Sequence, residues 1–481
     1  MSAWPEAKWV VDSIVSKISR PPGNMRKFEA IPLSATSIGL KFLEPSDTVD
    51  SDGAILCAVT GVMIRMSEYG FPTSPTEGSL VIDNKNLGAY ENEEYIVTGL
   101  TENKTYYFSA FPYSANNVYN QSSDSSNRVS EYPSGVKVYG IKRDVTLSSP
   151  VWTRTNSASG LSATASVGTT AGSSDFDSCY PWSDIARETL SANDVMVRIP
   201  KFYYRRYLEG NIEYIQIADG PKVGFSVHPA FNHGGTESDY IYVGAYKTSS
   251  NKLSKSGASP QVNQTRATMR TNAKSKGTGW GIIDISTVSA IQMLYLVEFA
   301  NNDSQSVIGK GYTNSSNSAA ITTGKCNSVP NLTGRPSGTD GATDVVYRGI
   351  EGFWGNVYEW VDGINCQGYS YYVCNNPSKY ADDTTSNYEL LSFTAPSSNY
   401  ISRMGLDDNN SSIMMPSAAS GSSSTYYCDY HSSGSSGSWY VCYRGGYWSI
   451  ALVAGLFCSV CNSSSSDADS YIGSRLLYIP S

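Results

Sequence analysis

The chain has 481 residues, of which 16% are charged, and it combines 35 tyrosines with a formal net charge of −8. A chain of this length exceeds what one hydrophobic core can organise, so roughly two to four domains are expected. The negative charge and the lack of a dense Lys/Arg run argue against nucleic acid as a partner. No apolar stretch approaches the ~20 residues of a membrane-spanning helix, so membrane insertion is not expected either.

The cellular compartment is indicated by the N-terminus and the cysteines. The first six residues, MSAWPE, lack the basic and apolar regions of an export signal. Nine cysteines at irregular spacing fit thiols made in a reducing cytoplasm better than a disulfide scaffold. No lysine follows Lys379, and the last hundred or so residues are rich in Tyr, Ser, Asn and Asp, as in antibody paratopes. A surface-like composition without an export signal is what a virion component released by lysis would have.

Residues 1–23 are predicted to form an N-terminal helix and attachment segment, closed by Arg20-Pro21-Pro22-Gly23. One face of this helix carries apolar side chains at spacings of three or four: Trp4, Ala7, Val11, Ile14 and Ile18. The face could dock to an assembly partner, to copies of itself, or to the next domain of the chain.

Residues 24–135 are predicted to form a β-sandwich, because short alternating segments such as 36–42 and 105–111 are separated by turns. The phrase GLTENKTYYF at residues 99–108 resembles the corner between strands E and F of fibronectin type III domains, where a Leu and a Tyr flank a turn. The resemblance implies an immunoglobulin-like sandwich that acts as a spacer.

Residues 136–194 are interpreted as a linker with the first strands of the next domain, since residues 157–174 are rich in Ser, Thr, Ala and Gly. Alternating strands are predicted at residues 195–204 and 240–246. Residues 286–301 show apolar positions at helical spacing and are expected to form the longest helix, with Ser286 as candidate N-cap. The insertion at residues 366–420 has too few aliphatic residues for a core of its own.

Three phrases in the last third of the chain occur in a fixed order: GNVYEW at residues 355–360, RGGYW at 444–448 and IGSRL at 472–476. They resemble the landmarks of the formylglycine-generating-enzyme-like branch of the C-type lectin fold. The resemblance covers residues 195–481 and implies an α+β C-type-lectin-fold ligand-binding domain. The overall fold class expected is therefore mostly β with some α.

Within that fold, the chain is most similar to the variable proteins of diversity-generating retroelements, and its phrases also resemble those of phage tail fibres. In that family, adenines of Asn codons near the C-terminus are replaced, which yields Tyr, Ser, Ile, Leu, Val or Asp but never Trp. The resemblance implies a variable region at residues 426–481. The residues of its expected ligand-binding face are Trp439, Tyr440, Tyr447, Ser449, Ile450, Leu452, Val460, Ser463, Asp467, Asp469 and Tyr471.

Spacing by two residues supports such a face if the backbone is extended. Tyr447 and Ser449, and likewise Asp467, Asp469 and Tyr471, would then point to one side. Trp448, Ala468 and Ile472 would point to the other. Exposed positions tolerate exchange far better than core positions, so alternation would separate the variable face from the core.

The residues give less support to a catalytic function. Glu359 and Asp362 could be catalytic, but Trp354, Val357 and Trp360 mark their segment as core, with Glu359 paired to an arginine such as Arg444. The enzymes of the resembled branch need a thiol pair, whose place here would fall between residues 448 and 453, where no Cys occurs.

The sequence gives similarly little support to a metal site. Cys458 and Cys461 form a lone CxxC that could join Cys428 and Cys442 in a zinc site, form a disulfide or stay as free thiols. Residues 407–410 (DDNN) could hold an ion or form a solvated turn. His228, His233 and His431 show no pattern of nucleophile and base.

Taken together, the sequence predicts a phage tail-associated receptor-binding protein without cofactor or metal, rather than an enzyme. Its expected partners are a bacterial surface receptor (protein or glycan) and other tail proteins bound through the N-terminus, and the resemblance implies a homotrimer. The expected place is the virion, acting at the host cell surface. The alternatives are a formylglycine-generating-type oxidase and a structural tail or baseplate protein without ligand.

Overall fold

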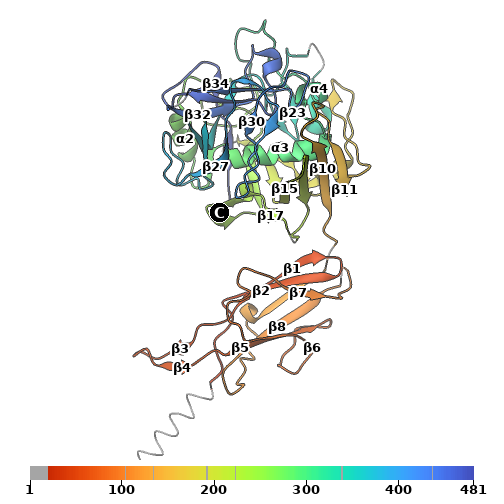
Figure 1. Ribbon diagram of the computed structural model, residues 1–481, viewed down its shortest axis with the longest axis vertical. Coiled ribbons are helices and arrows are strands. Elements are labelled where there is room, and N and C mark those ends of the chain that lie inside the picture. Colours follow the sequence, from red (N-terminus) through yellow and green to blue (C-terminus); the bar gives the residue numbers. More distant parts are fainter. Residues whose placement is uncertain are drawn as a thin grey trace, which may run out of the picture. The chain divides into compact units, whose positions relative to one another are not determined.

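A computed structural model describes residues 20–102, 104–133, 135–190, 193–222, 224–336, 340–435 and 437–480. The helix expected at residues 4–18 lies outside these ranges. The described chain is mostly β-strand with few helices and divides into two compact units (Figure 1). The first unit contains residues up to 137 and a short piece at 220–222, and the second contains the rest. None of the described helices is long and apolar enough to cross a membrane.

The first unit is a fibronectin type III-like β-sandwich, as expected. One sheet has three antiparallel strands, in the order β1 (Lys27–Ser34), β2 (Ser37–Leu43) and β7 (Tyr95–Thr98). The other has four, in the order β6 (Ser79–Asn84), β5 (Gly61–Ser67), β8 (Tyr106–Tyr113) and β9 (Arg128–Glu131). A separate hairpin is formed by β3 (Thr48–Val49) and β4 (Ile55–Cys57).

Apolar side chains at every second position of β2 contribute to the core of this unit. Ile38, Leu40 and Phe42 are fully buried and pack with residues of the second sheet such as Ile64 and Phe108.

The corner predicted at residues 99–108 is also present. Leu100 and Tyr106 are buried, and the Tyr106 hydroxyl accepts a hydrogen bond from the Thr101 amide at 3.0 Å. This bond ties the start of β8 to the chain just upstream, as in the tyrosine corners of sandwich domains.

The second unit is an α+β assembly of three larger sheets. The first has the order β11 (Thr153–Asn156), β10 (Val138–Asp144), β16 (Ile212–Ala218), β15 (Tyr203–Glu209), β17 (Ser226–Val227). The second has the order β13 (Ala186–Thr189), β14 (Val195–Pro200), β20 (Tyr240–Gly244), β35 (Leu476–Tyr478), β21 (Trp280–Ile282). The third has the order β27 (Glu389–Thr394), β26 (Ser370–Val373), β25 (Tyr358–Gln367), β32 (Trp439–Arg444), β33 (Ser459–Ser463), β31 (Tyr430–Ser433), β28 (Asn399–Tyr400), with β34 (Ile472–Gly473) paired to β25.

Short strands and helices complete this unit. The short strands pair as β12 (Ser166–Val167), β22 (Gly334–Arg335), β23 (Val346–Tyr347) and β24 (Ile350–Glu351), as β18 (Asn232–His233) with β19 (Thr236–Glu237), and as β29 (Arg403–Met404) with β30 (Pro416–Ala418). The α-helices of the described chain are α2 (Arg266–Lys274), α3 (Ile285–Phe299) and α4 (Ser304–Val307).

Helix α3 is the centre of the second unit, and Figure 1 shows it crossing the middle of this unit. All of its residues are buried, and it contacts β10 and β16 on one sheet and β25 on another. A helix that is apolar on every side is stable only when it is surrounded in this way. The helix predicted at residues 286–301 is thus confirmed, but its N-cap is Asp284, whose side chain accepts from the Thr287 amide at 2.8 Å, and not Ser286.

The passage interpreted as a linker differs from its expectation, because residues 138–190 belong to the second unit. Trp152, Phe176 and Trp182 are buried in its main core. The indole of Trp152 donates to Asn302 at 2.7 Å, and that of Trp182 donates to the Leu294 carbonyl at 3.2 Å. Large aromatic rings with partners more than a hundred positions away therefore fix a passage whose small polar residues resemble a linker.

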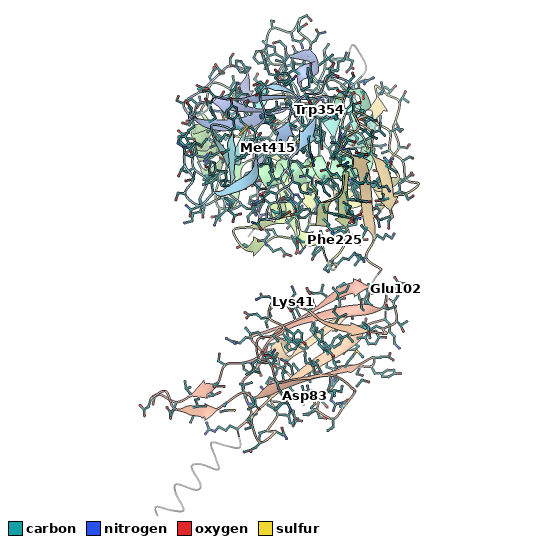
Figure 2. All side chains as sticks on the ribbon, viewed as in Figure 1. Lys41, Asp83, Glu102, Phe225, Trp354 and Met415 are labelled. Atoms are coloured by element: carbon teal, nitrogen blue, oxygen red, sulfur yellow. A yellow bond between two sulfur atoms is a disulfide. The ribbon has the colours of Figure 1, made fainter. Side chains whose placement is uncertain are left out.

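The insertion at residues 366–420 has only a small cluster of its own, formed by Cys374, Tyr380 and Tyr388 with Tyr372, in keeping with its few aliphatic residues. It adds β26, β27 and the β29–β30 hairpin to the second unit, and Tyr371, Leu391 and Met415 pack in the main core with Trp354. Trp354 and Met415 are labelled inside this unit in Figure 2.

Candidate functional site: the terminal face and its frame

The three phrases GNVYEW, RGGYW and IGSRL meet in the third sheet. Strand β25 pairs with β32 so that Glu359 lies opposite Arg444, and it pairs with β34 so that Glu359 lies opposite Gly473. Residues more than a hundred positions apart thereby become neighbours. We call residues 355–360, 444–446 and 472–476 the frame.

Glu359 is the centre of the frame and is fully buried. One carboxylate oxygen, Oε1, lies 2.7 Å from Nε of Arg475 and 2.9 Å from Nζ of Lys247. The other, Oε2, accepts from Arg444 at 3.1 Å. Burial alone would raise the pKa of Glu359, but the three neighbouring cations outweigh burial and lower it from 4.5 to about 2. The carboxylate is therefore ionised and fully occupied by structural contacts.

The arginines of the frame also hold its backbone. Arg475 donates to the carbonyls of Gly244, Glu351 and Gly352 at 2.6–3.1 Å. Arg444 donates to two further carbonyls, at 2.8 and 3.1 Å, and its guanidinium lies 3.6 Å from the centre of the Phe353 ring. These bonds compensate for the removal of the charges from water.

The backbone at residues 445 and 446 has a conformation that requires glycine. Both residues have positive φ, +88° and +89°. A Cβ at Gly446 would lie 2.4 Å from the Cβ of Ala454, and one at Gly445 would lie 2.9 Å from the Phe353 carbonyl oxygen. Only glycine fits both the conformation and the space at this bend.

An aromatic cluster lies where the frame reaches the surface. The ring of Tyr447 lies 4.8 Å from that of Tyr471 and 5.4 Å from that of Tyr358, which packs 4.6 Å from Tyr443. The Tyr471 hydroxyl donates to Asp469 at 2.9 Å, and burial together with this bond raises the pKa of Tyr471.

Part of the expected ligand-binding face is thus brought together. Tyr447, Asp469 and Tyr471 are half-buried, and Ile450 packs with the two tyrosines on the same cluster of buried residues. We call Tyr447, Ile450, Asp469 and Tyr471 the terminal patch. Its members combine an apolar ring surface with hydroxyl and carboxylate groups, which suits hydrogen-bonded contact with a partner.

The backbone beneath the patch is not extended, contrary to the expectation from spacing. Residues 464–471 form a loop in which Asp467 accepts from the Ser464 amide at 3.0 Å and donates its own amide to the Ser464 carbonyl at 3.0 Å. Short polar side chains that bond to nearby backbone favour such turns over strands. Ala468, expected to point inward, is exposed, whereas Asp467 is half-buried.

Two residues of the predicted face are in the interior and must be removed from it. Val460 is 5% exposed, because its side chain packs among the buried side chains of the Tyr358 cluster. Ser463 is 7% exposed, and its hydroxyl donates to the Tyr443 hydroxyl at 3.2 Å. Exchange at these positions would disturb packing instead of altering a surface.

Trp439 and Tyr440 lie at the opposite end of β32 from Arg444, about 15 Å along the strand. Trp439 packs 6.1 Å from Tyr372, and the Tyr440 hydroxyl bonds to the Ser435 amide at 2.9 Å. They do not belong to the terminal patch. Ser449 and Leu452 follow Tyr447 closely in the chain; Ser449 is half-buried and Leu452 is 43% exposed in a short 3-10 helix, Ala451–Val453.

The cysteines do not form the four-thiolate zinc site considered above. Cys442 and Cys461 are joined by a disulfide between β32 and β33, and Cys458 and Cys428 are free. Within the described ranges, Cys366, Cys442 and Cys461 are the one group of potential metal ligands that lie within 4.8 Å of one another. Residues 407–410 form a turn in which Asp407 accepts from the amides of Asn409 and Asn410.

All three histidines are buried, which the sequence did not indicate. His233 lies on a cavity together with Asp284, a residue that sequence reasoning did not single out. No local pattern joins these two positions, since they come from a hairpin and from the start of α3.

Comparison with known proteins adds little to this picture. No protein-family model and no curated protein matches the chain. Among solved structures, the fibronectin type-III domain of human fibronectin type III domain containing protein 3 is 18% identical and covers 24% of this chain and 90% of its own, with a TM-score of 0.17. A fibronectin type III domain derived from human KIAA0970 protein is 13% identical and covers 28% and 88%, with a TM-score of 0.18. Because both TM-scores are this low, neither structure supports a conclusion about this chain.

Proposed function

We propose that this chain is a phage tail-associated receptor-binding protein whose C-terminal unit, a C-type lectin-like domain, binds a bacterial surface molecule through the terminal patch. The observation that carries the proposal is the contrast between the patch and its frame. Tyr447, Asp469 and Tyr471 are partly accessible, while Glu359 and its three cationic partners are buried and joined by ion pairs.

The same contrast supports diversification of the patch. Substitution of exposed surface side chains usually changes stability by less than about 0.5 kcal/mol, whereas core changes cost about 1–5 kcal/mol, and the half-buried patch lies between these limits. Tyr447, Ile450, Asp469 and Tyr471 are also all reachable from Asn codons by replacement of adenines. A rigid frame that tolerates exchange above it is what a retroelement-diversified receptor-binding protein requires.

The remaining parts of the chain have supporting roles in this proposal. The N-terminal segment attaches to other tail proteins, and the sandwich separates the binding domain from that attachment. Assembly as a homotrimer would multiply weak contacts, so modest affinity at each patch is sufficient.

The direct test is binding of the fluorescently labelled full-length chain to a panel of candidate host bacteria. Tyr447→Ala combined with Tyr471→Ala is expected to reduce binding at least tenfold, since aromatic anchors dominate interface energies. Tyr369→Ala is the matched control, because Tyr369 is 40% exposed and lies outside the patch, on the β25–β26 turn.

Unchanged binding of the double variant, with an unchanged circular dichroism spectrum, would refute the terminal patch as receptor site. A genomic observation tests diversification separately: a near-duplicate of the 3′ end of the gene beside a reverse transcriptase gene is expected. Thiol-dependent oxygen uptake by the purified chain would instead favour the oxidase alternative.

A further inference from the structure

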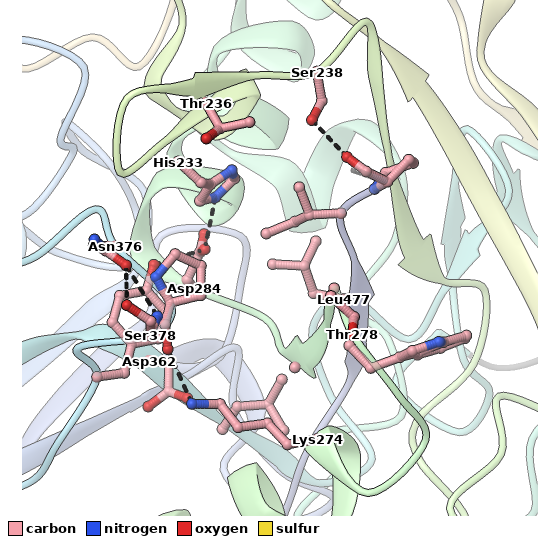
Figure 3. A pocket seen from close by; sticks show the side chains of 18 of the residues that line it. His233, Thr236, Ser238, Lys274, Thr278, Asp284, Asp362, Asn376, Ser378 and Leu477 are labelled. Carbon is pink, nitrogen blue, oxygen red and sulfur yellow. Dashed lines mark hydrogen bonds and ion pairs between the residues drawn. The ribbon is translucent and has the colours of Figure 1, made fainter.

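A second candidate site, which shares no residue with the terminal patch, lies in the same unit. It is a cavity of about 550 Å³ between β21, the end of α2, the β18–β19 hairpin, the loop 376–380 and the last residues of the described chain (Figure 3). Cavities of about 300–1,000 Å³ with mostly apolar walls and a few polar groups are typical of small-molecule sites.

The walls are mainly apolar. They include apolar residues from three separate segments: Trp280, Ile282, Pro377, Leu477, Ile479 and Pro480. Both Ile282 and Leu477 are buried, whereas Trp280 is half-buried and stacks 4.9 Å from Tyr478.

The cavity exists partly because Gly281 has no side chain. A Cβ built at Gly281 would meet no atom within 4 Å, and this residue lies in β21, opposite Leu477. Gly279, two residues earlier, is different, since its φ is +81° and a Cβ there would lie against the Ile479 carbonyl oxygen. Gly281 is therefore a position where a side chain can be added into the cavity without strain or collision.

The polar end of the cavity is formed by His233, Asp284 and Tyr380. Nε2 of His233 lies 3.0 Å from Oδ2 of Asp284, and the Tyr380 hydroxyl donates to the same oxygen at 3.0 Å. Burial alone would raise the pKa of Asp284, but its hydrogen bonds with His233 and Thr287 lower it below the ordinary value. The carboxylate accepts the proton of Nε2, so in the neutral imidazole Nδ1 is the ring nitrogen left as an acceptor.

The other ring nitrogen of His233 is left without a partner. His233 is 7% exposed, and its Nδ1 has no hydrogen bond to any described residue. In Figure 3 the ring stands on the cavity wall, with Nε2 toward Asp284 and Nδ1 directed away from it. A buried acceptor of this kind is costly unless a donor satisfies it.

The second carboxylate on the cavity is also paired. Both oxygens of Asp362 accept from Arg270, at 2.6–2.9 Å. The exposed Lys274 ammonium donates to the Pro377 carbonyl at 3.0 Å. Neither carboxylate of the described lining is therefore free to select a cationic ligand.

We infer that the cavity binds a small molecule without positive charge that has a compact apolar body and one hydroxyl or amide donor, which bonds to Nδ1 of His233. Because Nδ1 is covered in this structure, the donor reaches it when the β18–β19 hairpin shifts. The two exposed glycines at the tip of this hairpin, Gly234 and Gly235, both have positive φ. This site is independent of the receptor-binding proposal.

Phenol and toluene are a matched pair of probes, since they have the same size and differ by one donor. In titrations of the full-length chain followed by NMR, phenol is expected to bind about tenfold more tightly than toluene. Gly281→Val should abolish binding of both probes, with the thermal midpoint unchanged or raised, because a β-branched residue suits a strand.

His233→Gln isolates the polar contact. The glutamine amide can replace Nε2 as donor to Asp284 but offers nothing at the position of Nδ1, so phenol should bind this variant only as tightly as toluene. Tyr369→Ala, at an exposed position outside both sites, is the control and should bind phenol as the unchanged chain does.

Three results would overturn the inference. They are equal binding of phenol and toluene to the unchanged chain, binding of phenol that survives Gly281→Val in a folded protein, and preference for benzylammonium, which would make the site a cation site. Each can be obtained whether or not the chain binds bacterial cells.

Discussion

Glu359 is the residue at which the last part of the chain is held together. It joins β25 to Arg444 and to Arg475, the latter 116 positions later in the sequence. A buried ion pair contributes little net stability, but loss of one partner leaves unpaired buried charge and is strongly unfavourable. The contribution of Glu359 is therefore best measured by removing its charge alone.

Glu359→Gln is expected to lower the free energy of unfolding of the second unit by about 3–5 kcal/mol, because three cations would share a neutral amide. Chemical denaturation of the full-length chain measures this change. Glu209→Gln, at an exposed position, is the control and should change the free energy by less than about 0.5 kcal/mol.

The stability difference between the unchanged chain and Glu359→Gln is expected to depend on pH. Since the pKa of Glu359 is lowered from 4.5 to about 2, the stabilisation from its charge is fully present above pH 4.5 and is lost as the pH falls toward 2. The difference between the unchanged chain and Glu359→Gln should shrink through that window. A difference that stays constant from pH 6 to pH 2.5 would contradict the ionised state assigned to Glu359.

At the scale of elements, β32 and β33 are joined in two ways, by backbone pairing and by the disulfide between Cys442 and Cys461. These strands lead into the two loops that carry the terminal patch. The thiol of Cys366, on the neighbouring strand β25, lies 3.4 Å from the sulfur of Cys442. The pairing of these three cysteines therefore affects how firmly the loops are held.

Thiol titration of the denatured chain is expected to detect seven of the nine cysteines before reduction and nine after it. Because the linked positions are separated by 19 in the sequence, reduction should lower the free energy of unfolding by about 3 kcal/mol. Cys442→Ala with Cys461→Ala should be insensitive to reductant. Nine reactive thiols without reductant, or a Cys366–Cys442 bond found by peptide mapping, would contradict the assignment.

Elements with a regular pattern were predictable from the sequence. Alternation marked β2, β8, β14 and β20, and helical spacing marked α3. The terminal face was predicted only in part, since alternation was applied to loops whose shape depends on local bonds such as that between Asp467 and Ser464. Val460 and Ser463 were misplaced because burial by neighbouring strands has no signature in their own segment.

The cavity could not be predicted, for a related reason. Gly281, His233, Asp284 and Leu477 come from separate segments, and each is unremarkable in its local sequence. The supposed linker was misread because Trp152, Phe176 and Trp182 find their partners only in the folded second unit.

At the scale of the whole molecule, the two units have separate hydrophobic cores. The core around Leu40 and Phe108 contains only residues of the first unit, and the core around Leu294 and Trp354 contains only residues of the second. Because cooperative unfolding depends on a shared core, each unit is expected to unfold as its own transition.

Differential scanning calorimetry of the full-length chain should accordingly resolve two transitions, the larger enthalpy belonging to the larger second unit. Leu40→Ala removes a fully buried side chain of the sandwich and should destabilise only the smaller transition, by about 2–5 kcal/mol. Leu294→Ala is the matched change in α3 and should affect only the larger one. If either variant shifted both transitions together, the units would be thermodynamically coupled, and the sandwich could not act as an independent spacer for the binding domain.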